Sequence, residues 1–528
     1  MELNLSDHLD RQWAATCRIL LGQEIGELSE YKKWLYEGNG PRVTKKSSVS
    51  GKEVVYSSDK YPENSKWLRH DEADYNGKYE PLGINDVKDI DSILDAVRER
   101  IAYAGNIVLG NSKFVEDSTT ISDCYYILHS ERVAFSKNVA YSSRGGYSEN
   151  IFGCYGFGPA SFSMKSYGIT ESTRIFMASK VDFSSDIYYS HGLSNCTECI
   201  FSFNLRSRRH AIGNLVLPKD KYAGLKKKLV AEMTEKLRKE KRLVSISKLT
   251  EQGKPDYSAL KFAGNKIKLK NEQYNKSVIE EAFRQTTKVL LGMPLENIDD
   301  YADWLKNGSN VLLKQGRSCL SGEGIIQPDY AGFMDYPSDR LLTQDESNVI
   351  AEKLALSEDE LTKLSIETAS MTLQKIAYFC PYWLAGKLRN NIESPLNIDS
   401  IDCYAGILFI RSKRCAFSFS PRSCEYCFGS REGRHVSFSI NSHFSTRITR
   451  CFEVDHCSDC SDSYFCHNCE NVRDSMFCFN VKNLKNGIGN SQTTSDVYER
   501  AKVTLLEWIN KGLAEKKKPG ISIFSLKM

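Results

Sequence analysis

Four Cys-x-x-Cys units are the residues of this chain whose types and spacing could do chemistry. They are Cys196/Cys199, Cys424/Cys427, Cys457/Cys460 and Cys466/Cys469. The last two units form Cys-x2-Cys-x5-Cys-x2-Cys, and four thiolates suit the tetrahedral coordination of Zn²⁺. We therefore predict a structural zinc ion that leaves no position open for water or substrate. Its predicted ligands are Cys457, Cys460, Cys466 and Cys469.

Packing is the alternative role for these cysteines. Free cysteine is small, apolar and often buried. The five-residue spacer is shorter than that of an ordinary zinc ribbon, although His456 and His467 lie next to the cluster as further ligands. An earlier, similar segment manages without these cysteines. It holds Val181, Ser184, Ser190 and Leu193 at the corresponding positions.

Enzyme chemistry has little support in the sequence. We find no Gly-x-Ser-x-Gly, Walker loop, dinucleotide fingerprint or His-Glu-x-x-His. His191 and His467 recur in two similar segments among aromatic and Asn neighbours, which favours a structural, hydrogen-bonded role. We therefore predict a non-enzymatic protein, with no catalytic and no cofactor-binding residue. A carbohydrate-active β-helix is one alternative, because acidic residues cluster at turns, although such residues commonly face solvent. These residues are Asp182, Asp186, Asp459 and Asp462.

Charge and hydropathy give few hints about partners. The net charge is only +4, from 71 Lys and Arg against 67 Asp and Glu, so electrostatic attraction to nucleic acid or membrane has weak support. A zinc-binding module that binds nucleic acid or protein is a further alternative. A basic stretch from Arg206 to His210, which follows Phe201 and Phe203, favours nucleic acid as its partner. No apolar run is long enough to span a bilayer, and the start of the chain does not resemble a signal peptide. We expect a cytoplasmic protein with reduced cysteines.

The end of the chain repeats its middle. Tyr188, His191 and Asn204 match Tyr464, His467 and Asn480 at one constant separation in the sequence. The beginnings of the two halves also match, with Leu-Gly at 21–22 and 291–292 and Trp at 34 and 304. The sequence therefore predicts a tandem duplication, in which each half serves as a control for the other.

Each half is expected to have three parts, which gives an α+β fold class. Apolar residues at helical spacing predict a helical head that breaks at Gly22 or Gly292, with Gly38 or Gly308 after its second helix. Long arms follow at 39–85 and 309–340, with helices expected at 86–103 and 345–378. Short apolar runs between turn formers then predict many short strands, closed by a helix. The predicted boundaries are 1–106 (head and arm), 107–217 (strand array), 218–275 (capping helix and linker), 276–397 (head and arm), 398–494 (Cys-rich strand array) and 495–528 (capping helix and basic tail).

The strand arrays are interpreted as short β-solenoids. Cys457, Cys466 and Ser475 lie nine residues apart, as do Cys460, Cys469 and Cys478. Small side chains at a fixed period suit the narrow interior of stacked coils, and two nine-residue units would make one coil. A meandering antiparallel sheet is the alternative.

One closing segment is similar to a group of uncharacterised proteins. Asn204-Leu205-Arg206, Ile212-Gly213-Asn214 and Lys219 to Tyr222 resemble the segment that closes the Cys-rich repeats of proteins predicted in small-genome bacteria, archaea and phages. The second half departs from this pattern at Val481-Lys482 and has no Lys-x-x-Tyr after Asn490. The resemblance implies a repeat architecture and no known activity. We expect a structural or interaction protein that binds other subunits of a larger assembly, for which a viral particle is one candidate.

Overall fold

The computed structural model of the 528-residue chain contains two compact units. It describes residues 4–40, 42–260, 274–309, 311–329 and 335–526. Unit 1 is built from 1–42, 107–270 and 313–382, and unit 2 from 43–106, 271–312 and 383–528. Each unit mixes helices with sheets of mostly parallel strands, in agreement with the predicted mixture of helix and strand.

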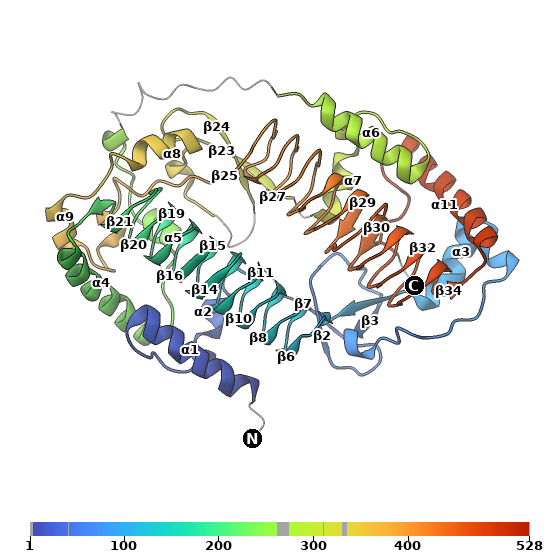
Figure 1. Cartoon of the computed structure of the whole chain (residues 1–528), viewed down its shortest axis with the longest axis horizontal. Helices are drawn as coiled ribbons and strands as arrows, with labels where there is room; N and C mark the ends of the chain where they lie inside the picture. The colour runs from blue at the N-terminus through green and yellow to red at the C-terminus, as the bar shows by residue number, and fades with distance from the viewer. Residues whose placement is uncertain (1–3, 41, 261–273, 310, 330–334, 527–528) are drawn as a thin grey trace. The chain divides into compact units, whose positions relative to one another are not determined.

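Unit 1 contains two long sheets formed by alternate strands of the chain (Figure 1). The ten-stranded sheet has the order β22-β21-β20-β18-β16-β14-β12-β10-β8-β6. Its strands are β6 (Lys113–Glu116), β8 (Tyr125–Leu128), β10 (Lys137–Ala140), β12 (Glu149–Phe152), β14 (Ala160–Met164), β16 (Ser172–Phe176), β18 (Ser185–Tyr188), β20 (Thr197–Ile200), β21 (Arg209–Ile212) and β22 (Leu215–Val216). The eight-stranded sheet has β5 (Val108–Leu109), β7 (Thr119–Ser122), β9 (Glu131–Ala134), β11 (Ser143–Gly146), β13 (Tyr155–Phe157), β15 (Tyr167–Thr170), β17 (Ser179–Asp182) and β19 (His191–Ser194). We call these two sheets array 1.

The strand register in array 1 has a constant step of twelve in the sequence. For example, Lys137 pairs with Glu149, and Ile151 with Ser163, in parallel. The parallel order argues against the antiparallel meander. A coil of two nine-residue units is wrong, because neighbouring strands of each sheet are offset by twelve residues. Only β5 and β7 begin their pairing at a different offset, and β21 pairs with β22 antiparallel.

The interior of array 1 follows a three-residue pattern. Ile121, Cys124, Ile127 and Ser130 are all fully buried. The residue before each of them has a φ between 47° and 60°, in the left-handed region. Most non-glycine residues rarely adopt this conformation. The repeated turn therefore depends on the stacking of the strands, and the amino-acid composition does not reveal it.

Buried serines bond the backbone of successive strands. Ser142 N–H donates to Ser130 Oγ (3.2 Å), and Ser142 Oγ donates to Ala140 O (2.9 Å) and accepts from Cys154 N–H (3.0 Å). The hydroxyls of Ser130 and Ser136 also donate to one backbone carbonyl and accept from one backbone N–H. These hydroxyls satisfy backbone groups that the interior would otherwise leave unpaired.

Replacing Ser142 tests this role. In Ser142→Ala the Cys154 N–H loses its buried acceptor, so we expect the free energy of unfolding to fall by about 1–3 kcal/mol. Ser142→Cys keeps a weak acceptor and should cost less. Urea denaturation of the full chain measures both, and equal losses would contradict the hydrogen-bond explanation.

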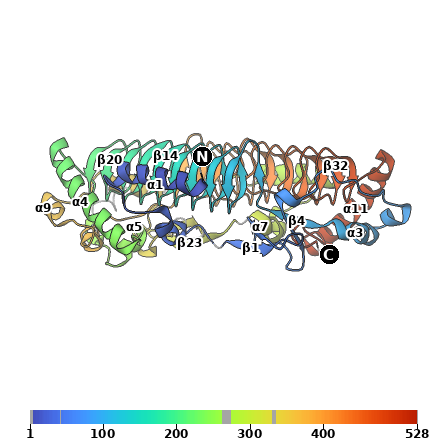
Figure 2. The ribbon, with the colours of Figure 1, turned by 90° about the horizontal axis from the view of Figure 1, so that it is seen from below.

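Helices cover one side and the end of array 1. α1 (Leu5–Leu21) begins after the cap Asn4, contacts strands β8 to β16, and ends at Gly22 (φ 79°), as predicted. A 3₁₀ turn (Leu28–Tyr31), α2 (Lys32–Tyr36) and α5 (Ile246–Glu251) are further helical segments of unit 1. α4 (Lys219–Glu240) contacts β21 and lies at the β20 end of the strand row (Figure 2). This is the position expected for the predicted capping helix.

Unit 2 has a similar organisation with more irregular strands. Its three-stranded sheet has β25 (Trp383–Ala385), β26 (Leu396–Ile398) and β27 (Phe409–Ile410). Its seven-stranded sheet has β28 (Glu425–Phe428), β29 (Ser437–His443), β30 (Phe452–Asp455), β31 (Ser461–Tyr464), β32 (Arg473–Met476), β33 (Lys485–Ile488) and β34 (Ser491–Gln492). Isolated parallel bridges, such as Ile401 with Lys413, continue the twelve-residue register between them. We call these strands array 2.

The second half of the chain gives unit 2 the helices α6 (Ser277–Leu291), α7 (Ala302–Ser309) and α11 (Ser495–Lys516). α6 ends at Gly292 (φ 75°), and α11 contacts β32 and β33, both as predicted. Gly308 was expected after the second helix but lies inside α7. A Cβ atom there would be 1.8 Å from His443 Cε1, so this glycine permits a close approach to the array.

The two arms do not join the arrays that directly follow them in the chain. Arm 1 (43–106) belongs to unit 2, and arm 2 (313–382) belongs to unit 1. Asn480 Nδ2 donates to Ala102 O in unit 2, and Asn204 Nδ2 donates to Tyr378 O in unit 1, both at 2.8 Å. The halves of the sequence therefore exchange their arms. Part of the predicted linker 244–275 and of the second predicted arm lies outside the described residues.

The arms contain more strand and less helix than predicted. Arm 1 has the hairpin β1 (Val43–Lys46) and β2 (Glu53–Tyr56), then β3 (Lys66–Arg69), α3 (Ile90–Val97) and β4 (Ala102–Gly105), which pairs with β3. Arm 2 has the hairpin β23 (Leu313–Arg317) and β24 (Gly324–Pro328), then α8 (Gln344–Ala351), α9 (Glu358–Lys363) and α10 (Ala369–Thr372). The expected helix over 86–103 ends early because its last residues join a sheet.

Candidate metal centres

Two groups of side chains in the described part of the chain are close enough to hold a metal ion, and both lie in unit 2. One is Cys415, Cys424 and Cys427, and the other is Asp455, His456 and His467. Within each group, one ligand atom per residue lies within 4.8 Å of the others. Neither group is the predicted set of four cysteines.

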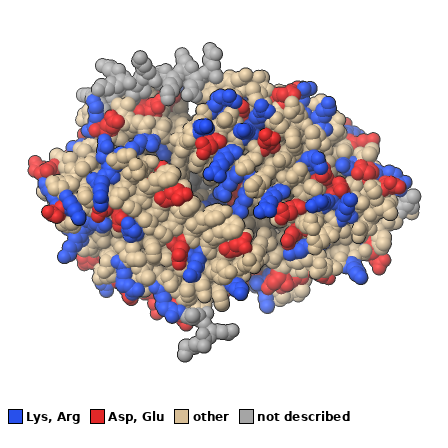
Figure 3. Space-filling model, viewed as in Figure 1, with Lys and Arg blue, Asp and Glu red and all other residues tan. Residues whose placement is uncertain are grey.

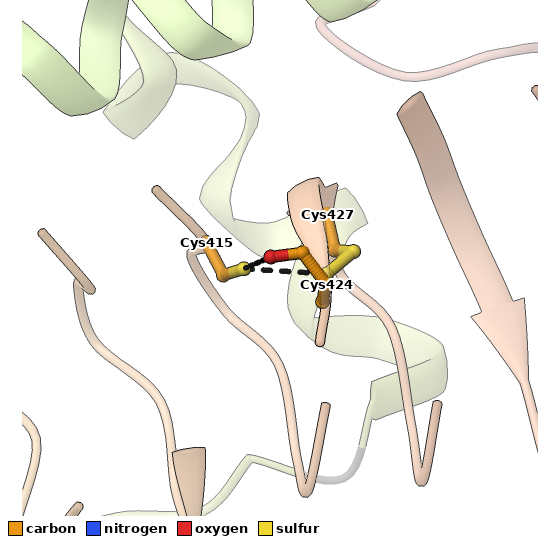
Figure 4. Close-up of side chains that lie close together, drawn as sticks. All are labelled: Cys415, Cys424 and Cys427. Atoms are coloured by element: carbon orange, nitrogen blue, oxygen red, sulfur yellow. Dashed lines mark hydrogen bonds between the residues drawn. A yellow bond between two sulfur atoms is a disulfide. The ribbon is translucent and has the colours of Figure 1, made fainter. Parts of the chain in front are cut away.

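The cysteine group forms a triangle of sulfurs in the interior of array 2 (Figure 4). Cys427 follows Cys415 by one register step, and Cys424 lies between them at the preceding interior position. Cys415 Sγ is 3.3 Å from Cys424 Sγ, and Cys424 is bonded to Cys427 in a disulfide with a Cα–Cα distance of 6.3 Å. All three side chains are at most 1% exposed. Cys415 could not be selected from the sequence, because the twelve-residue register step that separates it from Cys427 was not recognised.

The four predicted zinc ligands are buried in a neighbouring part of the same interior. Each sulfur lies within hydrogen-bonding distance of the backbone carbonyls two residues before it and nine after it. For example, Cys457 Sγ is 3.4 Å from both Asp455 O and Cys466 O. Cys457 also contacts the thiols of Cys460 and Cys469. Burial raises the pKa of the Cys469 thiol well above its usual value. Zinc binding by this set stays a prediction, and the thiols already fill interior positions as packed side chains.

The acid and histidine group is a hydrogen-bonded network between array 2 and arm 1. Asp455 Oδ2 lies 2.9 Å from His467 Nδ1 and accepts from Tyr61 Oη–H at 2.5 Å. Ala104 N–H donates to His467 Nε2 at 3.0 Å. His467 Nε2 is therefore unprotonated, and Nδ1–H points to Asp455. A metal on Nδ1 would reverse this tautomer and place two donors face to face, so the residues fit a structural network better than a metal site.

The matching histidine of unit 1 has a neutral partner. His191 is fully buried, its Nδ1 lies 2.9 Å from Ser179 Oγ, and its ring packs edge-on against Tyr336 from arm 2. Ser179 and Asp455 are separated by the same number of residues as His191 and His467, so they occupy equivalent positions beside the two histidines. Both histidines thus have the hydrogen-bonded setting expected from the sequence, and only unit 2 adds a carboxylate.

One buried and one half-buried histidine in unit 2 predict a loss of stability in acid. Burial lowers the pKa of His443 to about 3 and that of His70 to about 4, from the usual 6.5. Below pH 6.5 the unfolded chain therefore binds protons that the folded chain does not. The free energy of unfolding decreases as the pH is lowered. Between pH 7 and pH 5 we expect His443 alone to cost about 2 kcal/mol. Urea denaturation at both pH values measures this, and His443→Asn should show a smaller pH dependence.

A surface groove of about 830 Å³ lies on array 1. Two stacked aromatic rings border it: Phe135 and Tyr147, which are 41% and 59% exposed and have centroids 4.9 Å apart. Its other lining residues are Asp123, Tyr125, Ser136, Lys137, Ser148, Glu149, Pro159, Ala160, Ser161, Glu171, Ser172 and Thr173. Three carboxylates against one lysine make it acidic.

The charged residues singled out in the sequence are mostly paired. Asp186 forms a bidentate ion pair with Arg174 (2.8 and 2.6 Å), and Asp462 forms one with Arg450 (both 2.7 Å). Arg209 reaches Glu198 at 3.5 Å in the basic stretch after Phe203. Figure 3 shows basic and acidic side chains interspersed over the face in view. These pairings weaken the interpretation of the basic stretch as a phosphate-binding surface.

No helix in the described ranges has the length and apolarity needed to cross a membrane. Comparison with family models, curated proteins and solved structures finds no match for this chain.

Proposed function

We propose that arrays 1 and 2 are β-solenoids with twelve-residue coils, and that the chain is a tandem duplication of one such unit. Equivalent hydrogen bonds in the two halves support the duplication. Phe203 N–H donates to Asn214 Oδ1 at 2.7 Å, and Phe479 N–H donates to Asn490 Oδ1 at 2.8 Å. The bonds from Asn204 and Asn480 to the exchanged arms also match. Residues kept in both halves therefore serve the architecture.

We further propose a non-enzymatic structural or interaction protein that joins a larger assembly of subunits. The acidic, aromatic groove of array 1 is the observation that carries this proposal. Exposed aromatic rings beside polar side chains are typical of protein contact surfaces. The rings of Phe135 and Tyr147 are held by stacked backbone rungs, so binding would cost little ordering entropy.

Native complexes containing the protein provide the test. We expect the chain to elute from an extract of its own organism as part of a complex, cross-linked to other polypeptides through Lys137. The double variant Phe135→Ser with Tyr147→Ser should lose the complex, whereas Val216→Ser, at another exposed apolar position of unit 1 (53% exposed), should keep it. A monomer in the extract, or a complex unaffected by the double variant, would contradict the proposal.

A carbohydrate ligand is the second candidate for the same groove. Asp123, Glu149 and Glu171 line it beside Tyr147, and carboxylates with aromatic faces suit sugar hydroxyls and ring C–H groups. Binding of a glycan by the isolated wild type, with loss in Tyr147→Ser, would favour this function over subunit contact.

A further inference from the structure

We propose that the reduced thiols of Cys415, Cys424 and Cys427 bind a thiophilic divalent cation of the zinc and cadmium type. The Cys424–Cys427 disulfide is the alternative, metal-free state of the same residues. This site differs from the four cysteines predicted from the sequence, and it does not depend on the assembly function proposed above.

The positions of the three sulfurs suit a common ion. With metal–sulfur bonds near 2.3 Å, the sulfurs of a tetrahedral site are about 3.8 Å apart. Cys415 Sγ is already 3.3 Å from Cys424 Sγ, and all three sulfurs lie within 4.8 Å of one another. Opening the disulfide lets Cys424 and Cys427 separate by rotation of short side chains. The backbone of array 2 can therefore stay in register.

The arrangement of three ligands follows from the fold of array 2. Cys427 follows Cys415 by one twelve-residue register step, as the bridge from Ala416 to Phe428 shows for the adjacent residues. Cys424 lies one three-residue step before Cys427 and so occupies the neighbouring interior position. Cys403 precedes Cys415 by another register step, and its thiol contacts that of Cys415. Its sulfur is a candidate for a fourth ligand.

The segment around the three cysteines carries more basic than acidic residues. Three thiolates and one divalent cation leave a net charge of −1 in a buried site, which needs compensation. Between 411 and 427 the chain carries four exposed basic residues and a single acid, Glu425. The basic residues are Arg411, Lys413, Arg414 and Arg422.

The two states interconvert with balanced chemistry. An external dithiol reduces the Cys424–Cys427 disulfide, supplies two electrons and two protons, and becomes a cyclic disulfide. The cation then displaces three protons from the three thiols and forms three metal–sulfur bonds. A disulfide oxidant reverses the sequence by removing two of the three ligands, so oxidation should release the ion.

Cadmium titration of the full chain tests the site. The protein is reduced with dithiothreitol, freed of reductant under anaerobic conditions and titrated with Cd²⁺, with thiolate-to-cadmium absorption as the signal. We expect Cys424→Ser and Cys427→Ser each to lose one equivalent of cadmium. Cys199→Ser is the matched control from array 1, a buried cysteine of a Cys-x-x-Cys unit, and should keep that equivalent. Circular dichroism and thermal unfolding establish that each variant is folded.

A second measurement needs no variant. Mild oxidation of the wild type, with the disulfide mapped to Cys424–Cys427 by mass spectrometry, should abolish one equivalent, and dithiothreitol should restore it. Unchanged cadmium binding after this oxidation, or in the folded Cys424→Ser variant, would overturn the proposal. Loss only in Cys457→Ser would move the site to the cysteines predicted from the sequence. Neither outcome bears on the groove, because the groove lies on array 1.

Discussion

Cleavage of the chain between Leu260 and Tyr274 is expected to leave two fragments that remain bound. Unit 1 needs arm 2 from the C-terminal fragment, and unit 2 needs arm 1 from the N-terminal fragment. Arm 1 alone contributes a large buried surface to unit 2, including Tyr61 and Tyr103, at 5% and 0% exposure. Separating the fragments would expose both arms and both arrays. A protease site inserted between these residues, followed by size-exclusion chromatography, measures this.

Urea denaturation of the cleaved protein provides the control. Denaturation should separate the fragments, and refolding each one alone should give aggregated or unfolded material, because each then lacks part of both cores. Mixing the two before refolding should restore one complex of equal stoichiometry. Fragments that separate without denaturant would show that the arms are dispensable and contradict the exchange.

Removing the Asp455 carboxylate should strongly destabilise unit 2. Burial opposes the ionisation of Asp455, but His456 and His467 hold its pKa well below its usual value. In Asp455→Ala the buried donors of Tyr61 and His467 lose their shared acceptor. We expect a loss of about 2–6 kcal/mol in the free energy of unfolding, because each of the two unsatisfied buried donors costs roughly 1–3 kcal/mol.

Ser179→Ala is the matched control, since Ser179 occupies the same position beside His191. It removes a neutral partner, so we expect a smaller loss of about 1–2 kcal/mol. Hydrogen exchange should report the location: Asp455→Ala should speed the exchange of amides in arm 1, while Ser179→Ala should affect arm 2. Equal effects of the two substitutions would show that the charge of Asp455 adds nothing.

The helices that frame the arrays could be predicted because their signals are local. Gly22 and Gly292 end α1 and α6 in the left-handed conformation that glycine favours. Pro218 precedes α4, and an apolar stripe marks its buried face. Arm strands such as β4 were not predictable, because their pairing depends on partners distant in the sequence.

The Cys-x-x-Cys spacing has a structural explanation in the arrays. Interior positions recur every third residue, so buried cysteines automatically generate Cys-x-x-Cys units, and separations of nine and twelve are both multiples of that step. The amino-acid composition also gave no sign of the left-handed turns between the interior positions. Phe135 and Tyr126 have φ values of 50° and 60°, which only the stacked array makes tolerable. Nothing in the order of the segments indicated that arms 1 and 2 would be exchanged.

The three-residue step also governs how such a gene can change length. Adding or deleting one or two codons inside an array would turn the interior side chains of every later rung outward, much as a shifted reading frame alters every later codon. Loss or gain of twelve codons would instead remove or add a whole rung and keep the remaining pairs in place. Natural variants should therefore differ by complete rungs, with small insertions confined to the arms.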